Sequence, residues 1–527
     1  MPPYLLTIFY EYVILTSRIK KEICNMKTSK KILSLLLALL MIFSMASFAF
    51  ATETYKQNCP VIFIPGFSSS DIYTDINDPS TQISFPDTNA ILTAVADTLV
   101  PALAAYAINK DTDKLTDTVT KRINEMCAPL FNEKSGDPKQ GSGIAPREIK
   151  SASKKSRFTF RYDWRGDPMI IADELNKFIE TIRELSDCDK VALGCHSLGS
   201  SIALAYLSKY GNSAVSAIVL DSPACNGVDL IGNVLTGNIN LDAKSIGLFL
   251  KEILGDMEYK KLVSGFIDIM QSAGLFEMFS LFADEVIAEL APGIYRGTVA
   301  PLVGRWTTIW SMLPDNKMDE AKAYIFDEIL KDEDTSVLEA KIDNYNSVVR
   351  NNRTKTLKSF DKLGRLAIFS RYTNQTIPLV ESSIFMSDTI IDTKSTSFGA
   401  TTASIGEYFS DEYLKGKDMA YISPDRTVDA STCLFPEKTW FIKGSGHFET
   451  GGVTENYYDM FFFAKKELTC DTAEIGRFTY RDEATYSLVE DTTTPQKIEK
   501  PDFIRSLYNL ISALLEVMRN LINSKIA

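Results

Sequence analysis

A serine surrounded by small residues stands in Gly194–Gly199, which reads Gly-Cys-His-Ser-Leu-Gly. Lys190–Gly194 is a short apolar run typical of a buried strand, and Leu198–Tyr210 has the spacing of a helix. A serine at a sharp strand-to-helix turn presents its hydroxyl above the sheet edge, usually within a G-x-S-x-G pattern. Cys195 replaces the first glycine of that pattern and is small enough to fit. We therefore predict that Ser197 is a catalytic nucleophile.

A serine nucleophile needs a base that takes its proton and returns it to the leaving group, normally a histidine. The chain has only two histidines. His196 precedes the serine, and strand alternation points its side chain away from the serine's side. His447 lies in a glycine-rich loop, Lys443–His447, after the last apolar strand. By elimination, His447 is the predicted base.

The acid that orients the base should lie between nucleophile and base in the sequence. The loop Ser423–Asp429 supplies Asp425 and Asp429, and Ser387-Asp388-Thr389 supplies a third candidate. Each of them could equally be a solvated turn aspartate, the commoner fate of such residues. We prefer Asp425 and keep Asp429 and Asp388 as alternatives.

Two backbone N–H groups should hold the oxyanion that forms during acyl transfer. The N–H of Leu198 is at the start of the helix after the serine, where developing negative charge is favoured. The second donor should come from the loop after the first strand, where Phe67 or Ser68 follows Gly66. We predict an oxyanion hole made by Phe67 and Leu198.

Short apolar strands alternate with helical segments around these residues. Near-continuously apolar strands separated by helices indicate βαβ crossovers and a mostly parallel sheet that is buried on both faces. The predicted fold class is therefore α/β, with a mostly parallel sheet and a helical cap insertion. The expected strands are Pro60–Pro65, Phe158–Trp164, Lys190–Gly194, Ser216–Leu220, Leu366–Ser370 and Thr439–Lys443, and the expected helices before the cap are Ile91–Ala107, Leu115–Phe131, Pro168–Leu185 and Leu198–Tyr210.

Changes in residue pattern divide the chain into segments. Helical spacing dominates 225–359, which we interpret as a cap over the active site, while strand signals flank it on both sides. From Phe503 onward, apolar residues form one stripe of an amphipathic helix, which either docks onto the body or contacts a lipid surface. The expected segments are an upstream extension (1–25), a signal peptide (26–51), the first part of the core (52–224), the cap (225–359), the second part of the core (360–480), a linker (481–502) and the C-terminal helix (503–527).

The N-terminal region is typical of a secreted protein. Lys27, Lys30 and Lys31 precede the apolar run Ile32–Phe50, and Ala49-Phe50-Ala51 matches a signal-peptidase site. An uncleaved membrane anchor is the alternative, because the run is almost long enough to span a bilayer. Export would permit disulfides among the seven cysteines that follow the signal, but their pairing cannot be read from the sequence.

The composition limits the classes of molecule that the protein is expected to bind. The net charge of −12 gives no electrostatic support for binding nucleic acid, whereas neutral or lipidic substrates remain compatible with it. The cysteines show no CxxC pair or other zinc-site spacing, so no metal site and no cofactor are expected.

Four stretches taken in order resemble lecithin:cholesterol acyltransferase-like lipases. They are Phe63–Phe67, Tyr162–Arg165 (Y-D-W-R), His196–Gly199 and Asp425–Val428 (D-R-T-V), followed by His447. The Y-D-W-R and D-x-T-V strings are the discriminating pieces. The matching stretches span most of the chain from Val61 to about Phe448, without the cap and the tail.

This resemblance implies an α/β-hydrolase that acts on acyl esters through a Ser197–Asp425–His447 triad. The family's acid stands first in the D-x-T-V string, which favours Asp425 over Asp388. Arg426 departs from the glycine or aspartate frequent in the family, without removing a catalytic group. Asp163 and Arg165 within Y-D-W-R either form a structural ion pair or line the site.

The expected activity is that of a secreted lipase or esterase acting through an acyl-enzyme. An O-acyltransferase differs only in the alcohol that releases the acyl group, and a peptidase could use the same triad. A catalytically idle, surface-bound lipid-binding protein is the alternative from a different class. Contact with a lipid interface is expected through the cap or the C-terminal helix.

Overall fold

The computed structural model describes residues 57–83, 85, 90, 93–240, 242–253, 260–378, 380, 384–449, 453–482, 485, 487–496, 502 and 504–512. The predicted upstream extension (1–25) and signal peptide (26–51) lie outside these residues.

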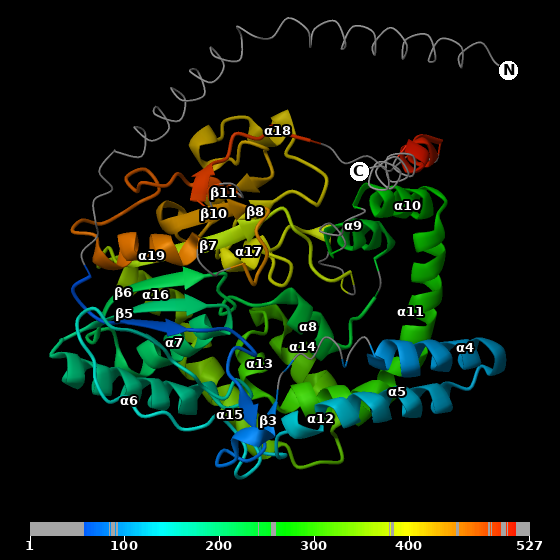
Figure 1. Cartoon of the computed structure of the whole chain (residues 1–527), viewed down its shortest axis with the longest axis horizontal. Helices are drawn as coiled ribbons and strands as arrows, with labels where there is room; N and C mark the ends of the chain where they lie inside the picture. The colour runs from blue at the N-terminus through cyan, green and yellow to red at the C-terminus, as the bar shows by residue number, and fades with distance from the viewer. Residues whose placement is uncertain are drawn as a thin grey trace, which may run out of the picture. The chain divides into compact units, whose positions relative to one another are not determined.

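An eight-stranded sheet forms the centre of the described chain, in the order β12-β11-β10-β7-β6-β5-β1-β4 (Figure 1). All neighbouring strands are parallel except the β11–β12 pair. The strands are β1 (Val61–Ile64), β4 (Arg157–Thr159), β5 (Val191–His196), β6 (Val215–Asp221), β7 (Leu366–Tyr372), β10 (Thr439–Lys443), β11 (Phe478–Asp482) and β12 (Ser487–Glu490). Two further pairs are short: β2 (Ile72–Tyr73) with β3 (Gln82–Ile83), and β8 (Thr401–Thr402) with β9 (Val428–Asp429).

Helices cover both faces of this sheet, as parallel strands require. On one face, α6 (Pro168–Ser186) and α7 (Leu198–Tyr210) pack against each other, and α16 (Arg353–Asp361) packs on α7. On the other face α19 (Val453–Phe463) lies over β5, where Gly194 leaves room for the rings of Tyr458 and Phe462. Every residue of β5 and β7 is buried, which explains their near-continuous apolar sequences.

The second predicted strand is shorter than expected. The alternating pattern of Phe158–Trp164 predicted a strand throughout, but β4 ends at Thr159. The N–H of Phe160 still donates to the carbonyl of Phe63, and the chain then leaves the sheet. Tyr162 and Trp164 are buried instead against the loop that follows β1.

The segment predicted as a cap is helical. It contains α8 (Asp229–Thr236), α9 (Ala243–Ile253), α10 (Lys260–Ser272), α11 (Leu275–Ile294), α12 (Ala300–Leu302), α13 (Thr307–Ser311), α14 (Met318–Lys322), α15 (Ser336–Val348) and the start of α16, with π-helical turns at Tyr295–Val299 and Ala323–Ile329.

Two earlier helices pack with this segment, not with the sheet. The apolar pattern of Ile91–Ala107 and Leu115–Phe131 corresponds to a π-helical turn at Val95–Leu99 followed by α4 (Val100–Asn109) and α5 (Thr112–Cys127). Tyr106 and Leu115 form a buried cluster with Val286 and Leu290 of α11. Figure 1 shows α4 and α5 crossing the lower end of α11. The helices that pack together here therefore come from both sides of the serine turn in the sequence.

The C-terminal part differs from the prediction in two ways. The expected linker 481–502 contains the end of β11 and all of β12, so it contributes the edge of the sheet. Residues 504–512 are helical, and Leu510 packs at Gly265 of α10. The apolar side chains of Ile504, Tyr508 and Ile511 are 77%, 70% and 49% exposed, so these three do not dock onto the body, the first of the two roles expected for the stripe.

Two further features bear on the sequence predictions. The seven cysteines from Cys59 to Cys470 are all unpaired in the structure. Over the described ranges, no single helix is long and apolar enough to cross a bilayer. The bent pair formed by Ser264–Ser272 and Leu275–Arg305, with 70° between its two parts, would be long and apolar enough by length and composition alone.

Candidate active site

Ser197 occupies the turn between β5 and α7. Its backbone angles are φ 53° and ψ −124°, a combination that is costly for a residue with a side chain and that persists only where the surrounding structure enforces it. The turn is held by the Ser197 N–H, which donates to the carbonyl of Asp221 at 3.1 Å, and by the Ala224 N–H, which donates to the Ser197 carbonyl at 3.2 Å. The predicted strained serine turn is therefore present.

Two glycines permit the close packing of this turn. A Cβ on Gly199 would lie 2.1 Å from the carbonyl oxygen of Ile64, so only glycine lets α7 approach the end of β1. A Cβ on Gly66 would lie 2.8 Å from the Cβ of Ser197 and 3.2 Å from its Oγ. The loop after β1 therefore touches the serine itself, as an oxyanion loop must.

His447 lies in the loop after β10, against the residue that precedes the nucleophile. The imidazole rings of His447 and His196 are 4.8 Å apart. The Nε2 atom of His196 lies 3.1 Å from the carbonyl oxygen of His447, and because a carbonyl only accepts, this nitrogen carries the proton. His447 and His196 are both buried. The structure thus brings the predicted base to the serine turn.

Asp388, not Asp425, is the hydrogen-bond partner of His447. The Nδ1 of His447 lies 2.7 Å from Oδ2 of Asp388, and the other carboxyl oxygen accepts the N–H groups of Ile390 (3.0 Å) and Ile391 (2.7 Å). Asn374 fixes the two loops to each other, since its side chain donates to the Ser445 carbonyl at 2.9 Å. Asp388 therefore occupies the position of the orienting acid.

Our preference for Asp425 is thus corrected by the structure. The carboxylate of Asp425 forms a salt bridge with Lys443 and accepts hydrogen bonds from the hydroxyls of Ser423 and Thr427, both at 2.6 Å. Asp429 is also engaged elsewhere, with Lys417 at 2.8 Å. Lys443, the last residue of β10, neutralises the charge of Asp425. This ion pair gives the Asp425 carboxylate a structural role.

The surroundings of Asp388 favour its charged form. Burial alone would raise the pKa of this fully buried carboxyl, but the interaction with His447, the Ile391 N–H and the charge of Arg371 lower it to about 2. Arg371 is itself completely buried and paired with Asp221, which also accepts a hydrogen bond from Tyr458. An ionised carboxylate at Nδ1 holds the imidazole in the tautomer whose Nε2 is free to accept a proton.

His196 is neutral at physiological pH. Burial, together with the adjacent His447, lowers the pKa of His196 to about 3. In the unfolded chain a histidine has a pKa of about 6.5. Between these two values the unfolded state binds a proton that the folded state does not, so stability falls as pH falls.

We expect this histidine to contribute a slope of about 1.4 kcal/mol per pH unit to the free energy of unfolding below about pH 6.5. Replacing His196 by Asn, whose amide can still donate to the His447 carbonyl, should remove this contribution. Urea unfolding of both proteins between pH 5 and pH 8 measures the difference. Equal slopes in wild type and His196→Asn below pH 6.5 would contradict the buried, neutral state of His196.

The Y-D-W-R string holds the loop that follows β1. The hydroxyl of Tyr162 donates to the carbonyl of Pro65 at 2.6 Å, and the indole of Trp164 donates to the carbonyl of Ser70 at 3.1 Å. Arg165 is completely buried and forms a two-point ion pair with Asp163 (2.9 and 2.7 Å). Of the two roles left open by the sequence, the structure therefore gives Asp163 and Arg165 the structural one.

The predicted oxyanion donors belong to the two segments that meet at the serine. Leu198 is the first residue of α7, and Phe67 follows Gly66 in the loop that touches Ser197. The ring of Phe67 packs on Trp164, with centroids 4.5 Å apart. Ser68, the alternative to Phe67, has a positive φ of 63°, and its hydroxyl donates to the carbonyl of Phe85. These contacts fix the path of the loop beside the nucleophile.

No group of three or more histidine, cysteine or acidic side chains is arranged to hold a metal ion within the described part of the chain. Cys195, the departure from G-x-S-x-G, is fully buried beside β1, and burial raises the pKa of its thiol far above the ordinary value. Cys195 therefore acts as a packing residue in this turn.

Comparison with known proteins supports the fold. Residues 140–244, which run from before β4 through α8 and include Ser197, match the family model described as alpha/beta hydrolase fold. No curated protein sequence matches the chain. The chain is similar to one chain of the crystal structure of the Tle4–Tli4 complex, at 10% sequence identity over 88% of this chain and 98% of that chain, with a TM-score of 0.25, which is too low to support an argument. With its parallel sheet and serine turn, the protein has the α/β-hydrolase fold.

Proposed function

We propose that this protein is a serine hydrolase of carboxylic esters, a lipase or esterase that works through a Ser197–His447–Asp388 triad. The observation that carries the proposal is the 2.7 Å hydrogen bond between His447 and the buried Asp388, in loops that meet at the strained turn of Ser197. A base oriented by an ionised acid next to a nucleophilic serine turn is the arrangement that acyl transfer requires.

The proposed reaction has two halves. The Oγ of Ser197 attacks the ester carbonyl carbon while Nε2 of His447 takes its proton, and the oxyanion is held by the N–H groups of Leu198 and Phe67. When the tetrahedral intermediate collapses, the alcohol leaves with the proton from His447. Water then attacks the acyl-enzyme, again giving a proton to His447, and the carboxylic acid is released as Ser197 regains its proton. Asp388 keeps its negative charge throughout and stabilises the imidazolium.

A covalent probe tests the proposal. The full chain should hydrolyse p-nitrophenyl butyrate, and an alkyl fluorophosphonate should abolish this activity by attaching to the peptide that contains Ser197, as read by mass spectrometry. Lack of both ester hydrolysis and labelling would favour the idle lipid-binding protein. Cleavage of peptides without cleavage of esters would favour a peptidase, and predominant transfer to an added alcohol would favour an O-acyltransferase.

Contact with a lipid interface is part of the proposal. Exposed apolar side chains gather on helices that pack on one another: Phe266 (55%) on α10, Met278 (68%) and Leu281 (74%) on α11, and Tyr508 (70%) on the helix 504–512. A contiguous patch of exposed apolar side chains marks an interaction site on a protein. Binding of the full chain to phosphatidylcholine vesicles should weaken when Met278 and Leu281 are both changed to Ser; unchanged binding would overturn this role.

Action outside the cell follows from the sequence pattern of residues 26–51. Export by the signal peptide predicts a mature protein that starts at Thr52. N-terminal sequencing of the protein recovered from culture medium tests this, and a cell-bound protein that retains the apolar segment would indicate an anchor instead.

A further inference from the structure

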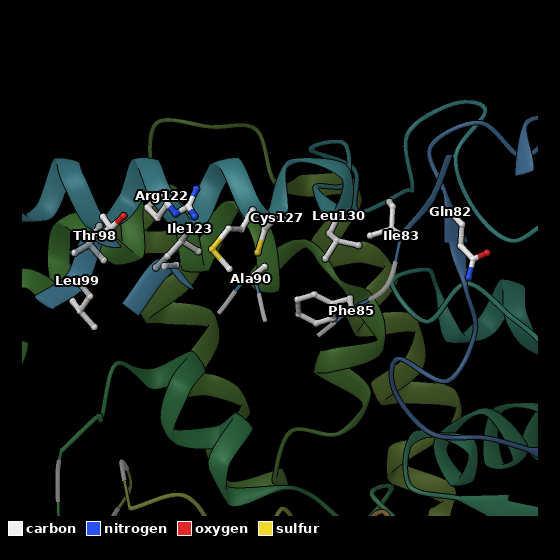
Figure 2. A pocket seen from close by; sticks show the side chains of 13 residues that line it. Gln82, Ile83, Phe85, Ala90, Thr98, Leu99, Arg122, Ile123, Cys127 and Leu130 are labelled. Atoms are coloured by element: carbon white, nitrogen blue, oxygen red, sulfur yellow. The ribbon is translucent and has the colours of Figure 1, made fainter. Parts of the chain in front are cut away.

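An apolar cavity of about 700 Å³ lies beside α5, outside the triad (Figure 2). Its size is within the range of ligand pockets in proteins. The lining combines one face of α5 with the segment that leads to α4, and it is apolar apart from three residues, Gln82, Thr98 and Arg122. The lining residues are Gln82, Ile83, Phe85, Ala90, Ala94, Thr98, Leu99, Val119, Arg122, Ile123, Met126, Cys127 and Leu130.

Phe85 connects this cavity to the oxyanion loop. It lines the cavity, and its ring lies edge-on to that of Phe67 with centroids 6.4 Å apart. The hydroxyl of Ser68 donates to the Phe85 carbonyl. Phe67 follows Gly66, whose Cβ position would be 3.2 Å from the Oγ of Ser197. The loop that touches Ser197 at Gly66 therefore carries, at the next residue, the ring that packs on Phe85 at the cavity.

The aromatic side chains between the serine and the cavity form one cluster. Trp306 lies 5.7 Å from Phe67 and 6.2 Å from Phe85, measured between ring centroids, and Trp164 lies 4.5 Å and 5.8 Å from the same two rings. Phe67 and Phe85 are only partly buried, whereas both tryptophans are almost completely buried. The two phenylalanines are thus the accessible members of an aromatic cluster that packs on two buried tryptophans.

We propose that this cavity receives the acyl chain of the ester, so that the preferred substrates are long-chain acyl esters. This inference rests on the proposed function, since the scissile carbonyl must lie at Ser197. An acyl chain that leaves the carbonyl past Phe67 meets Phe85 and then the apolar lining, where burial of each methylene is favourable. Ten of the thirteen lining residues are apolar, so the cavity suits a hydrocarbon chain better than a polar head group, which stays with the alcohol outside it.

Cys127 provides a direct test of occupancy, because its thiol lines the cavity and is unpaired. The full chain is first labelled at Ser197 with hexadecyl or ethyl fluorophosphonate and then exposed to N-ethylmaleimide. Cys188, which is also partly buried but lies outside the cavity lining, is the matched control. The hexadecyl label should cause loss of Cys127 alkylation while Cys188 alkylation is retained, and the ethyl label should protect neither.

The outcomes separate the two proposals. If Ser197 takes neither label, the serine hydrolase itself is refuted. If Ser197 takes the hexadecyl label and Cys127 is alkylated as fast as in the unlabelled protein, the acyl chain lies elsewhere and the cavity assignment is overturned.

A substitution that fills the cavity gives an independent readout. Ala94→Trp should lower the ratio of kcat/KM for p-nitrophenyl palmitate to that for the butyrate by about tenfold or more, because excluding even two methylenes from an apolar site is worth that factor. Ala105→Trp adds the same ring at an exposed position of α4 and should leave the ratio unchanged. The ratio does not depend on how much of each variant is folded. An unchanged ratio in Ala94→Trp would overturn the assignment.

Discussion

Replacing Asp388 by Asn is expected to lower kcat by about 10⁴, with little change in KM, because the orienting carboxylate is lost while the shape is kept. The oxygen of the introduced amide would still accept the N–H groups of Ile390 and Ile391, so its NH₂ group would face Nδ1 of His447. His447 would then accept at Nδ1 and carry its proton on Nε2, the atom that must take the proton of Ser197. Steady-state kinetics on p-nitrophenyl butyrate measures the loss.

Asp425→Asn is the matched control, since the residue type and the change are identical. Asp425 interacts with Lys443 and with the Ser423 and Thr427 hydroxyls, none of which belongs to the proposed triad. We expect kcat to stay within about tenfold of wild type, while the free energy of unfolding falls by about 1–3 kcal/mol for the weakened buried ion pair. A loss of about 10⁴ in Asp425→Asn with an active Asp388→Asn would restore the assignment drawn from the D-x-T-V string.

The contrast between these two aspartates shows which parts of the site the sequence can reveal. Ser197 and His447 could be selected as candidates because the serine stands in a strand–turn–helix context and because the chain has only two histidines. Acidic residues number 68, so elimination cannot select one. The choice of Asp425 depended on a short string, and nothing in that string indicates that Lys443, further along the chain, neutralises it. Asp388 was a candidate, but its contact with His447 joins two loops that are far apart in sequence.

The sheet was predicted well at its centre and poorly at its edge. Central strands such as β5 are buried on both faces and therefore read as continuous apolar runs. β12 (Ser487–Glu490) is an edge strand with polar or charged residues at both ends, so its sequence resembles that of a loop. The expected linker at 481–502 was wrong for this reason.

The packing of α4 and α5 on α11 illustrates a different limit of prediction from sequence. Periodicity located helices near α4 and α5, but it carries no information about which surface their apolar faces meet. Their partner is α11, whose Val286 and Leu290 lie far away along the chain. The cavity proposed for the acyl chain lies at α5 and the segment before α4, so it could not be assigned from the sequence alone.

Removal of the Ser197 hydroxyl has the largest expected effect. Ser197→Ala should lower kcat on p-nitrophenyl esters by about 10⁶, because without Oγ no acyl-enzyme forms and only binding and oxyanion stabilisation remain. Ser208→Ala makes the same change on α7, at a hydroxyl that has no hydrogen-bond partner among the described residues, and should retain full activity. Equal activity in Ser197→Ala and wild type would exclude Ser197 as the nucleophile.

Stability should respond to this position in the opposite direction from activity. The angles φ 53° and ψ −124° cost a residue with a Cβ about 1–3 kcal/mol, and glycine escapes most of that cost while losing about 0.5–1 kcal/mol through its freer unfolded chain. The free energy of unfolding of Ser197→Gly, measured by denaturant titration, should therefore exceed that of Ser197→Ala by about 1 kcal/mol, although both variants are inactive. Equal stability of the two variants would mean that the turn is unstrained. A more stable, inactive glycine variant would show that the backbone conformation at Ser197 is kept for the placement of its hydroxyl and not for folding.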